Sequence, residues 1–384
     1  MDPKRKFFLF KQAKHFCSVP WNYFKVDMSG NVTTCVNGIH PLGSLKNNSI
    51  EEILSNSALT EIKQNLSQDI LDSNCRRCQS YENNVDDNNS YDFLRGLYNS
   101  MFKFENIDYD NLAEFKLQGI DLHWSSICDL KCITCWSNQS SSIAKEQGKE
   151  ILHTPTEQAD KLIDYIVANQ ETLKEIYLSG GEPTLIKHNL RLLKKLRRDL
   201  SFQIRINTNM MYDLDNQIIK ELREFPNVLV TMSADAMEER FNYIRRGADW
   251  NKFLKNLDAL IKTHFTWRLN SVFFIGSAVY LTDTQNFFIE NYGVNNFTIN
   301  QCGMEQEHLY CRNLPADVKD KVLEKLIVHQ NLYKQNFNLV GQINNCIDEI
   351  NTKGNPDYQN YFENIDKKAG TNWVRTFPEL KYDN

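Results

Sequence analysis

Residues 117–136 read LQGIDLHWSSICDLKCITCW, and this stretch decides the fold. In its first half Ile120, Leu122 and Trp124 are apolar, and the residues between them are small or polar. A period of two is that of a β-strand with one polar face. The second half spaces three cysteines as C-x3-C-x2-C. The stretch therefore predicts a strand that is followed directly by a loop with three thiols.

Working outward, the chain beyond Phe115 alternates strand-like and helix-like segments. We predict amphipathic helices between strands near 117–123, 174–179, 202–208, 228–234, 270–280 and 296–301. This alternation is typical of βαβ units and a parallel sheet. Six such units predict an α/β fold, an open, partial (β/α)6 TIM-like barrel.

The first and third of these strands each have a polar face. Asp121 and His123 lie on one side of the first strand, and Arg205 and Asn207 on one side of the third. Strands of a filled barrel, or between two helix layers, are apolar on both faces. We therefore predict that these four side chains line a ligand cavity and contact the substrate. A solvent-exposed edge strand is the alternative.

The segment that contains the first cysteines has a different pattern. Tyr23 to Val36 is typical of a hairpin with a Ser-Gly-Asn turn. Residues 49–66 predict a helix, in which Ser49 and Glu52 stand at capping-box spacing. The polar run at 82–90, ENNVDDNNS, is the predicted linker.

Three domains follow from these patterns. We predict a small N-terminal cysteine module over 1–95, the barrel over 110–305 and a helical extension over 306–384. In the extension, helices are expected near 315–337 and 340–351, followed by a polar tail that contains aromatic residues.

Composition excludes several classes of partner. The 44 Lys and Arg against 49 Asp and Glu give a net charge of -5, so no nucleic acid partner is expected. Apolar runs fall short of the roughly 20 residues of a spanning helix, and Phe7–Phe10 is too short for a signal-peptide core. We expect a cytoplasmic protein without membrane contact, where clustered cysteines bind metal more often than they pair. A composition rich in Asn, Lys and Ile suggests an AT-rich genome, and a viral source fits it.

The first cysteine group suits an iron–sulfur cluster. Cys128, Cys132 and Cys135 can bind three irons of a four-iron, four-sulfur cluster and leave the fourth iron open. A zinc site is the alternative, but structural zinc takes four Cys or His ligands. The nearby imidazole, His123, lies within the strand.

The second group is Cys17, Cys35, Cys75 and Cys78. Four thiolates suit either zinc or a fully ligated iron–sulfur cluster, and spacing alone leaves both open.

Here the sequence resembles the radical S-adenosylmethionine (SAM) superfamily, whose hallmark is this three-cysteine spacing. Residues 177–183, YLSGGEP, look like the family's GGEP segment. Thr208-Asn209-Met210 resembles its TNG segment, and Ser233-Ala-Asp235 resembles its SLD segment. All three stand at the carboxyl ends of predicted strands, the edge at which open α/β sheets and barrels bind ligands.

The resemblance implies a set of SAM contacts. The family usually has an aromatic residue at the position of Thr134, next to the adenine, whereas here Trp136 follows the third cysteine. An arginine at 245 or 246 is expected to pair with the SAM carboxylate, and a solvated helix-end arginine is the alternative. The implied contacts are Thr134, Trp136, Gly180, Gly181, Glu182, Thr208, Asn209, Ser233, Asp235, Arg245 and Arg246.

A second resemblance concerns the N-terminal cysteines. The spacing C-x12-G-x4-C through Gly30 is similar to the start of the SPASM domain and of its shortened form, twitch, which carry auxiliary four-iron clusters. In most relatives this module follows the barrel, whereas here it precedes it. The resemblance implies one auxiliary four-iron cluster, with Cys17, Cys35, Cys75 and Cys78 as its ligands.

Together the resemblances imply an oxidoreductase that reductively cleaves SAM to a 5′-deoxyadenosyl radical and abstracts hydrogen from a substrate. Its electron donor would be a flavodoxin or ferredoxin. SPASM and twitch enzymes commonly modify peptides or proteins, so a peptide or protein substrate is favoured. A small molecule, carbohydrate or nucleotide is the first alternative, and a non-catalytic zinc or iron–sulfur module is the second.

Cys302, after the sixth strand, is a further candidate near the substrate, with a buried structural cysteine as its alternative.

Overall fold

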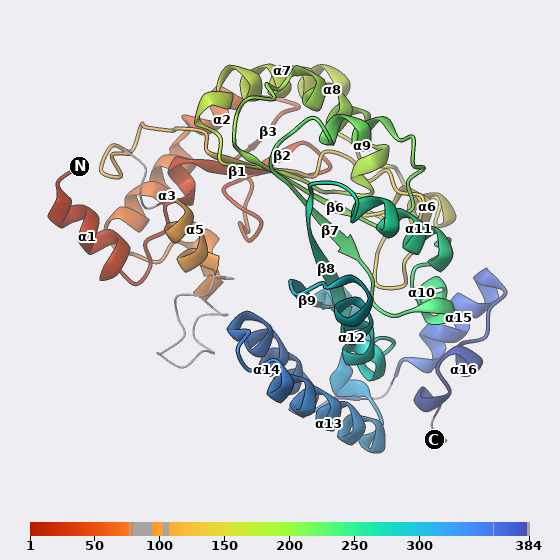
Figure 1. The fold of residues 1–384 in the computed structure, drawn as a ribbon. Coiled ribbons are helices and arrows are strands. Elements are labelled where there is room, and N and C mark those ends of the chain that lie inside the picture. Colours follow the sequence, from red (N-terminus) through yellow and green to blue (C-terminus); the bar gives the residue numbers. More distant parts are fainter. Residues whose placement is uncertain (77, 80–93, 103–106, 356, 382–384) are drawn as a thin grey trace. The chain divides into compact units, whose positions relative to one another are not determined.

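The structure is a computed structural model that describes residues 1–76, 78–79, 94–102, 107–355 and 357–381 (Figure 1). It divides into two compact units. Unit 1 comprises residues 1–127, 152–206 and 217–227, and unit 2 comprises 128–151, 207–216 and 228–384. The predicted domain bounds stay predictions, and the predicted linker at 82–90 lies outside the described residues.

Unit 1 carries the N-terminal hairpin and the first strands of the barrel. Its helices are α1 (Pro3–Lys11), α2 (Ile50–Leu54), α3 (Ser57–Ser67), α5 (Leu94–Phe102), α7 (Thr156–Ala168), α8 (Lys187–Lys195) and α9 (Gln217–Leu222). Its strands are β1 (Tyr23–Val26), β2 (Asn31–Thr33), β3 (Gly43–Ser44), β4 (Gly119–Leu122), β5 (Glu175–Leu178) and β6 (Gln203–Thr208), of which the last two residues belong to unit 2.

The strands of unit 1 form a sheet in the order β3-β2-β1-β4-β5-β6. Strand β1 is antiparallel to β2 and parallel to β4, so the N-terminal hairpin extends the barrel sheet. Strands β4, β5 and β6 are parallel to one another. Because β4 lies between β1 and β5, it is not an exposed edge strand, and that alternative is wrong.

Local side chains explain the predicted hairpin. The Asp27 carboxylate accepts hydrogen bonds from the backbone N–H groups of Ser29 (2.8 Å) and Asn31 (2.9 Å). Gly30 between them has φ +83°, a conformation that glycine adopts without steric cost. The hairpin and its turn are confirmed.

The helix predicted over 49–66 is two helices. The capping box of Ser49 and Glu52 is present and begins α2. This helix ends at Leu54, and the side chain of Asn56 accepts a hydrogen bond from Leu59 N–H (2.9 Å) to begin α3. Ser and Asn favour caps over helix interiors, which explains the break.

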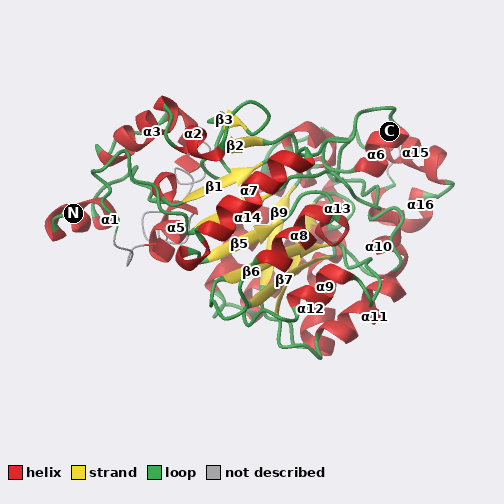
Figure 2. Ribbon diagram, turned by 90° about the horizontal axis from the view of Figure 1, so that it is seen from above, coloured by secondary structure: helices red, strands yellow, loops and turns green. Residues whose placement is uncertain are grey.

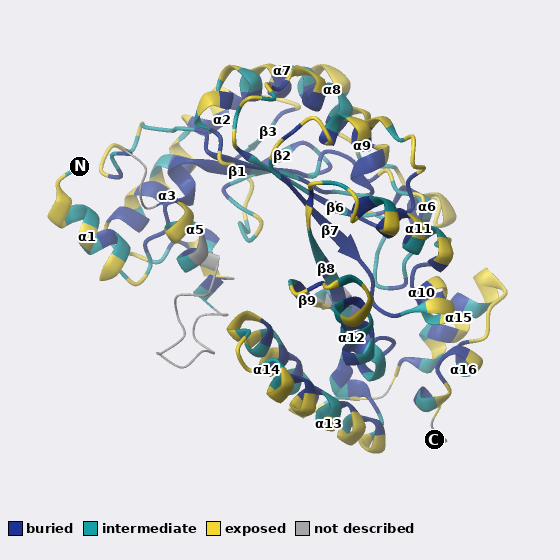
Figure 3. Cartoon of the chain, viewed as in Figure 1, coloured by how far each residue is buried: buried dark blue, intermediate teal, exposed yellow. Residues whose placement is uncertain are grey.

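One face of the unit 1 sheet is covered by helices (Figures 1 and 2). The ring of Phe24 lies 6.5 Å from that of Tyr165 on α7, and the indole of Trp124 donates to Asn189 on α8 at 2.8 Å. In Figure 3 strands β1, β4 and β5 are largely buried, and the exposed residues follow the outer sides of these helices. The alternate residues of β4, which include Asp121, therefore point to the opposite, inner face.

Unit 2 contains the remaining strands and the C-terminal helices. Its strands are β7 (Val228–Ser233), β8 (Thr266–Phe273) and β9 (Phe297–Gln301), which are parallel in that order. Its helices are α6 (Ser141–Glu146), α10 (Glu238–Ile244), α11 (Trp250–Leu260), α12 (Leu281–Tyr292), α13 (Ala316–Leu332), α14 (Phe337–Asn351), α15 (Gln359–Ala369) and α16 (Trp373–Thr376), with 3-10 turns η7 (Met304–Leu309) and η8 (Cys311–Asn313).

Two predictions in unit 2 need correction. The strand predicted at 270–280 is β8, at Thr266–Phe273. The strand ends there because the Ser277 hydroxyl accepts from Phe274 N–H (3.1 Å) and donates to the Val272 carbonyl (2.6 Å), which closes a turn. The polar tail also contains a regular helix, α15, whose Phe362 and Ile365 are buried.

The predicted fold class is confirmed. Strands β4 to β9 alternate with helices along the chain as expected for an open, partial (β/α)6 barrel, with a small N-terminal module and a helical C-terminal extension. Within the described ranges, no helix combines the length and apolarity that a membrane crossing requires.

Candidate functional site

The three-cysteine loop lies in unit 2, and serines at the start of α6 hold its first cysteine. The Ser141 hydroxyl accepts from Cys128 N–H (3.0 Å), and the Ser142 hydroxyl donates to the Cys128 carbonyl (2.8 Å). The Ser140 hydroxyl donates to the Leu130 carbonyl at 2.6 Å. These bonds fix the backbone from which the first thiol projects.

The middle of the loop is held from two sides. Ile133 N–H donates to the Ile244 carbonyl, at the end of α10, at 2.9 Å. The Ile133 carbonyl accepts from the Tyr361 hydroxyl (2.6 Å) and from Gln306 Nε2 (3.2 Å). The C-terminal extension therefore contacts the cysteine loop, which sequence reasoning missed.

Burial and one guanidinium set the electrostatics of the thiols. Burial raises the pKa of Cys132 to about 11, and the positive charge of Arg245 opposes that rise. Burial and the neighbouring Cys132 raise the pKa of Cys135 to about 12. Such thiols ionise when cationic iron binds them, so the three donors fit a cluster that supplies positive charge.

Both candidate arginines pair with carboxylates of the chain. Arg245 lies 2.9 Å from Asp235, and both side chains are buried. Arg246 lies 2.9 Å from Glu146, which also lies 3.0 Å from Lys131. Neither arginine is a solvated helix-end residue.

The segment after β6 reaches the cysteine loop. Asn209 Nδ2 donates to Asp129, the residue after Cys128, at 2.9 Å. Met210 has φ +64° where the family pattern has glycine. Asn256 holds this left-handed turn, because its Nδ2 donates to the Met210 carbonyl at 2.7 Å.

Other predicted residues in unit 2 lie as follows. The Ser233 hydroxyl donates to Asn207 Oδ1 at 3.4 Å. Thr208 is buried at the end of β6, and its hydroxyl accepts a hydrogen bond from Met210 N–H at 3.1 Å. Thr134 is half-buried within the loop. The Trp136 ring packs on Gly303, where an added Cβ would lie 2.8 Å from it.

In unit 1 the GGEP segment makes a tight turn after β5. Gly180 has φ +114°, and a Cβ on Gly181 would lie 2.3 Å from the Ile127 carbonyl oxygen. Gly181 N–H donates to the Ser125 carbonyl at 2.9 Å. The Glu182 carboxylate accepts from the Thr184 hydroxyl at 2.6 Å. The close approach of two backbones is a further reason for these glycines, beside the predicted approach to SAM.

The four N-terminal cysteines come together in unit 1. Burial raises the pKa of the Cys17 thiol, and repulsion from Cys75, Cys35 and Cys78 adds to the rise. Burial likewise raises the pKa of Cys75 to about 12. Asn37 Nδ2 donates to Cys78 Sγ at 3.5 Å. Four mutually repelling thiols are a donor set that iron would stabilise as thiolates.

None of the ten cysteines, all of which the structure describes, is joined in a disulfide bond. Among the residues that the structure describes, no group of three or more His, Cys, Asp or Glu side chains is arranged around a single ion position.

The inner face of β4, β5 and β6 carries a polar cluster, hereafter the inner-face cluster: Asp121, His123, Glu175, Tyr177 and Arg205. His123 Nε2 lies 2.8 Å from Asp121 Oδ1. The Arg205 guanidinium lies 3.8 Å from the centre of the Tyr177 ring and 3.5 Å from Glu175.

Strand register explains this cluster. Lys25, Asp121, Tyr177 and Arg205 stand opposite one another on adjacent strands, so they form one row across β1, β4, β5 and β6. Sequence reasoning found Asp121, His123 and Arg205 but missed Glu175 and Tyr177. Residues 175–178, EIYL, carry the same period-two signal that could have identified them.

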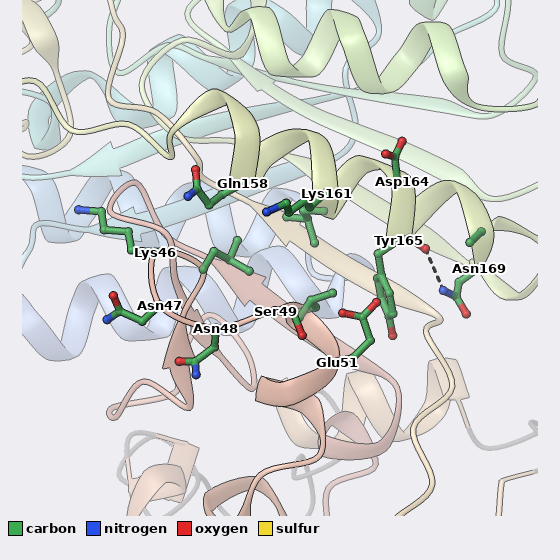
Figure 4. A pocket seen from close by; sticks show the side chains of 14 residues that line it. Lys46, Asn47, Asn48, Ser49, Glu51, Gln158, Lys161, Asp164, Tyr165 and Asn169 are labelled. Carbon is green, nitrogen blue, oxygen red and sulfur yellow. Dashed lines mark hydrogen bonds between the residues drawn. The ribbon is translucent and has the colours of Figure 1, made fainter.

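A separate hollow of about 740 Å³ lies in unit 1 between the loop before α2 and helix α7 (Figure 4). Lys46, Asn47, Gln158, Lys161 and Tyr165 are among its lining residues. No residue predicted to bind a cofactor or substrate lines it.

Cys302 is buried after β9 in unit 2. Burial raises the pKa of its thiol, and the charges of Glu349 and Asp235 add to the rise. It directly precedes Gly303, on which Trp136 packs.

Comparisons with known proteins agree with these features. Residues 122–276 match the model of the radical SAM superfamily, and residues 17–79 match the SPASM model, an iron–sulfur cluster-binding domain. The chain is 26% identical over 152 residues to GTP 3′,8-cyclase of Rhizobium etli and 25% identical over 153 residues to that of Bradyrhizobium diazoefficiens, which covers 38% of this chain in each case. It spans 40% and 41% of the length of these curated relatives.

Solved structures with a similar chain course include anSMEcpe with bound AdoMet, at 19% identity and a TM-score of 0.45 over 59% of this chain and 60% of that one. Streptococcus suis SuiB bound to S-adenosylmethionine is 16% identical with a TM-score of 0.43, over 82% of this chain and 69% of that one.

The two family matches fall on the two cysteine groups, one on each. The cofactors of the chain are accordingly a four-iron, four-sulfur cluster with SAM and an auxiliary iron–sulfur cluster. With its thiol loop after the first barrel strand and its second thiol set in the N-terminal module, the chain belongs to the radical SAM superfamily of enzymes that carry a SPASM-type auxiliary domain.

Proposed function

We propose that the chain cleaves SAM reductively and uses the 5′-deoxyadenosyl radical to abstract hydrogen from a peptide or protein held against the inner-face cluster. The bound iron–sulfur cluster supplies the electron for this cleavage. Cys128, Cys132 and Cys135 hold that cluster, and the observation that carries the proposal is the loop that orders them, fixed at Cys128 by the α6 serines and at Ile133 by Tyr361.

The inner-face cluster supports substrate binding because it is polar and already organised, with Asp121 and Glu175 buried and the other three side chains half-buried. Arg205 is held between the Tyr177 ring and Glu175, so less side-chain entropy is lost when it binds a ligand. The Asp121 carboxylate beside His123 orients the imidazole ring. A reactive carbon radical demands a substrate fixed in one position away from water.

The charge on this face favours a peptide over a polyphosphate. Among its described side chains, Arg205 and Lys25 are opposed by Asp121 and Glu175. A nucleoside triphosphate needs an excess of cations. Amide and side-chain groups of a peptide match a face with both donors and acceptors.

A small molecule, carbohydrate or nucleotide is the second candidate substrate. The observation in its favour is the similarity to proteins named GTP 3′,8-cyclase, at 26% identity over 38% of this chain.

We further propose that the SAM contacts implied by the resemblance apply here, at Thr134, Trp136, the GGEP turn, the segments after β6 and β7, and Arg245 or Arg246. Since Arg245 and Arg246 already pair with Asp235 and Glu146, a carboxylate of SAM would share or displace those partners. Cys17, Cys35, Cys75 and Cys78 would hold the auxiliary cluster, which would supply an electron-relay centre there. With four protein thiolates as ligands, it would leave no iron open to the substrate.

Deuterium transfer tests this function. Reduced enzyme is incubated with SAM and either a fully deuterated peptide pool or a deuterated metabolite pool, and 5′-deoxyadenosine is analysed by mass spectrometry. Deuterium from the peptide pool supports the proposal, and deuterium from the metabolite pool alone would replace it with the second candidate. Release without deuterium from either pool would contradict both substrate classes.

A further inference from the structure

Helix α15 and the turn η7 bring two residues of the C-terminal extension, Tyr361 and Gln306, to the cysteine loop of unit 2. The loop turns between two cluster ligands, since Cys135 N–H donates to the Cys132 carbonyl at 3.0 Å. Ile133 is the first residue inside this turn, and it is 1% exposed. The direction of its carbonyl fixes the peptide plane between Ile133 and Thr134.

That carbonyl has two donors from the extension. The Tyr361 hydroxyl donates at 2.6 Å and Gln306 Nε2 at 3.2 Å. The Tyr361 ring is itself held, because it lies 4.5 Å from the ring of His308. Burial raises the pKa of Tyr361 to about 12, so its hydroxyl keeps the proton that it donates.

The other side of the turn is fixed by packing. Trp136, next to Cys135, lies on Gly303, where a Cβ would stand 2.8 Å from the indole ring. Gly303 has φ -65°, so its backbone would accept alanine, and the space taken by Trp136 is the constraint. Contacts from the extension therefore hold Ile133, and Gly303, just before the extension, packs against Trp136.

We propose that Tyr361 is a positioning residue for the SAM-binding cluster, and that its hydrogen bond to Ile133, with support from Gln306 and Gly303, sets the orientation in which the loop presents the cluster to SAM. Thr134 and Trp136, the predicted neighbours of the adenine, lie on the segment that this bond holds. The inference rests on the cluster assignment and is independent of the substrate.

Tyr361→Phe removes only the hydroxyl, and Tyr358→Phe is its matched control. Tyr358 is buried in the same extension, and its hydroxyl donates to the Leu380 carbonyl at 2.7 Å, away from the cysteine loop. Both variants should keep wild-type iron and sulfide, because all cluster thiols remain. The loss of one hydrogen bond should weaken SAM binding by Tyr361→Phe roughly three- to tenfold, measured by anaerobic calorimetry. The SAM-induced change in the EPR spectrum of the reduced cluster should be altered in that variant alone.

Gly303→Ala provides an independent test if Tyr361→Phe does not fold. The added methyl group displaces Trp136 and should reduce SAM affinity while iron content is kept. Gly341→Ala, where nothing lies within 4 Å of the added Cβ, is its control.

Wild-type SAM affinity and EPR response in both Tyr361→Phe and Gly303→Ala would overturn the proposal. Equal losses in Tyr361→Phe and Tyr358→Phe would also overturn it, because they would indicate a general structural role. Each readout uses SAM alone, so the outcome is independent of deuterium transfer from any substrate.

Discussion

The guanidinium of Arg245 lies 2.9 Å from the carboxylate of Asp235, and both side chains are buried near Cys132 of the three-cysteine loop. Arg245 also opposes the rise in the pKa of Cys132, so its charge acts on one of the three proposed cluster ligands. Asp235, just after β7, thus holds the arginine whose positive charge acts on Cys132 of the cysteine loop.

Asp235→Asn should destabilise the protein because it leaves the Arg245 charge buried without its partner. Breaking a buried pair on one side lowers the free energy of unfolding by about 3–5 kcal/mol. Anaerobic urea unfolding measures this loss. Glu157→Gln, which breaks the exposed pair with Lys161, is the control and should leave the unfolding midpoint unchanged. Equal midpoints for the two variants would show that Arg245 is not desolvated.

Gly181→Ala should disrupt the GGEP turn. Its Cβ would lie 2.3 Å from the Ile127 carbonyl oxygen, and a backbone atom cannot move aside cheaply. We expect lower thermal stability and loss of SAM binding. In contrast, Gly341→Ala in α14 should raise stability by about 0.5–1 kcal/mol, because alanine favours the helix. Normal SAM affinity in Gly181→Ala would contradict the close approach of the Gly181 and Ile127 backbones.

Glu349 predicts a pH dependence of stability. Burial raises its pKa to about 7 from the ordinary 4.5. Between those values the folded state binds more protons than the unfolded state, so the contribution of Glu349 falls as pH rises from about 4.5 and is lost above about 7. The side chain that Glu349→Gln introduces cannot ionise, so this variant should not lose stability in this way. Between about pH 4.5 and pH 7, its free energy of unfolding should rise by roughly 2–3 kcal/mol relative to that of the wild type.

Urea unfolding of both proteins at pH 5 and pH 8 measures the difference. An equal difference in stability at the two pH values would mean that Glu349 titrates normally.

Arg205→Lys should impair substrate use and spare SAM binding. Lysine keeps the charge but loses the planar group that lies over Tyr177 and beside Glu175. We expect kcat/KM for hydrogen abstraction to fall about tenfold or more. A tenfold fall corresponds to the loss of roughly 1.4 kcal/mol of transition-state binding. SAM cleavage without substrate should continue at the wild-type rate.

Arg198→Lys is the matched control, because Arg198 also lies over a ring, that of Phe225, and pairs with Glu221. Identical turnover in Arg205→Lys and wild type would place the substrate elsewhere.

Much of the fold could be predicted from local patterns. The period of two in β4 and β6, the cysteine spacings and the Ser49 capping box are short-range signals, and the structure confirms the strands and the cap. The helix break at Ser55 and Asn56 was missed because apolar residues continue with helical spacing across it. The shift of β8 depends on the Ser277 turn, a side-chain hydrogen bond that strand propensity does not encode.

The candidate site was less predictable where it depends on distant contacts. Tyr361 stands 228 residues after Ile133, and no local pattern connects them. Its helix, α15, is mostly polar, and only Phe362 and Ile365 are buried in it, so the apolar face rests on few residues. Glu175 was missed for another reason, because β5 is only four residues long and its alternation is brief.

Chemical analysis of anaerobically purified protein, combined with a SAM cleavage assay, tests the central claim most directly. We expect about eight irons and eight sulfides per chain for two four-iron clusters, and release of 5′-deoxyadenosine when the reduced protein meets SAM. Cys128→Ala, Cys132→Ala and Cys135→Ala together should abolish that release and keep about four irons on the N-terminal cysteines. About two zinc ions per chain, no sulfide and no 5′-deoxyadenosine would contradict the account.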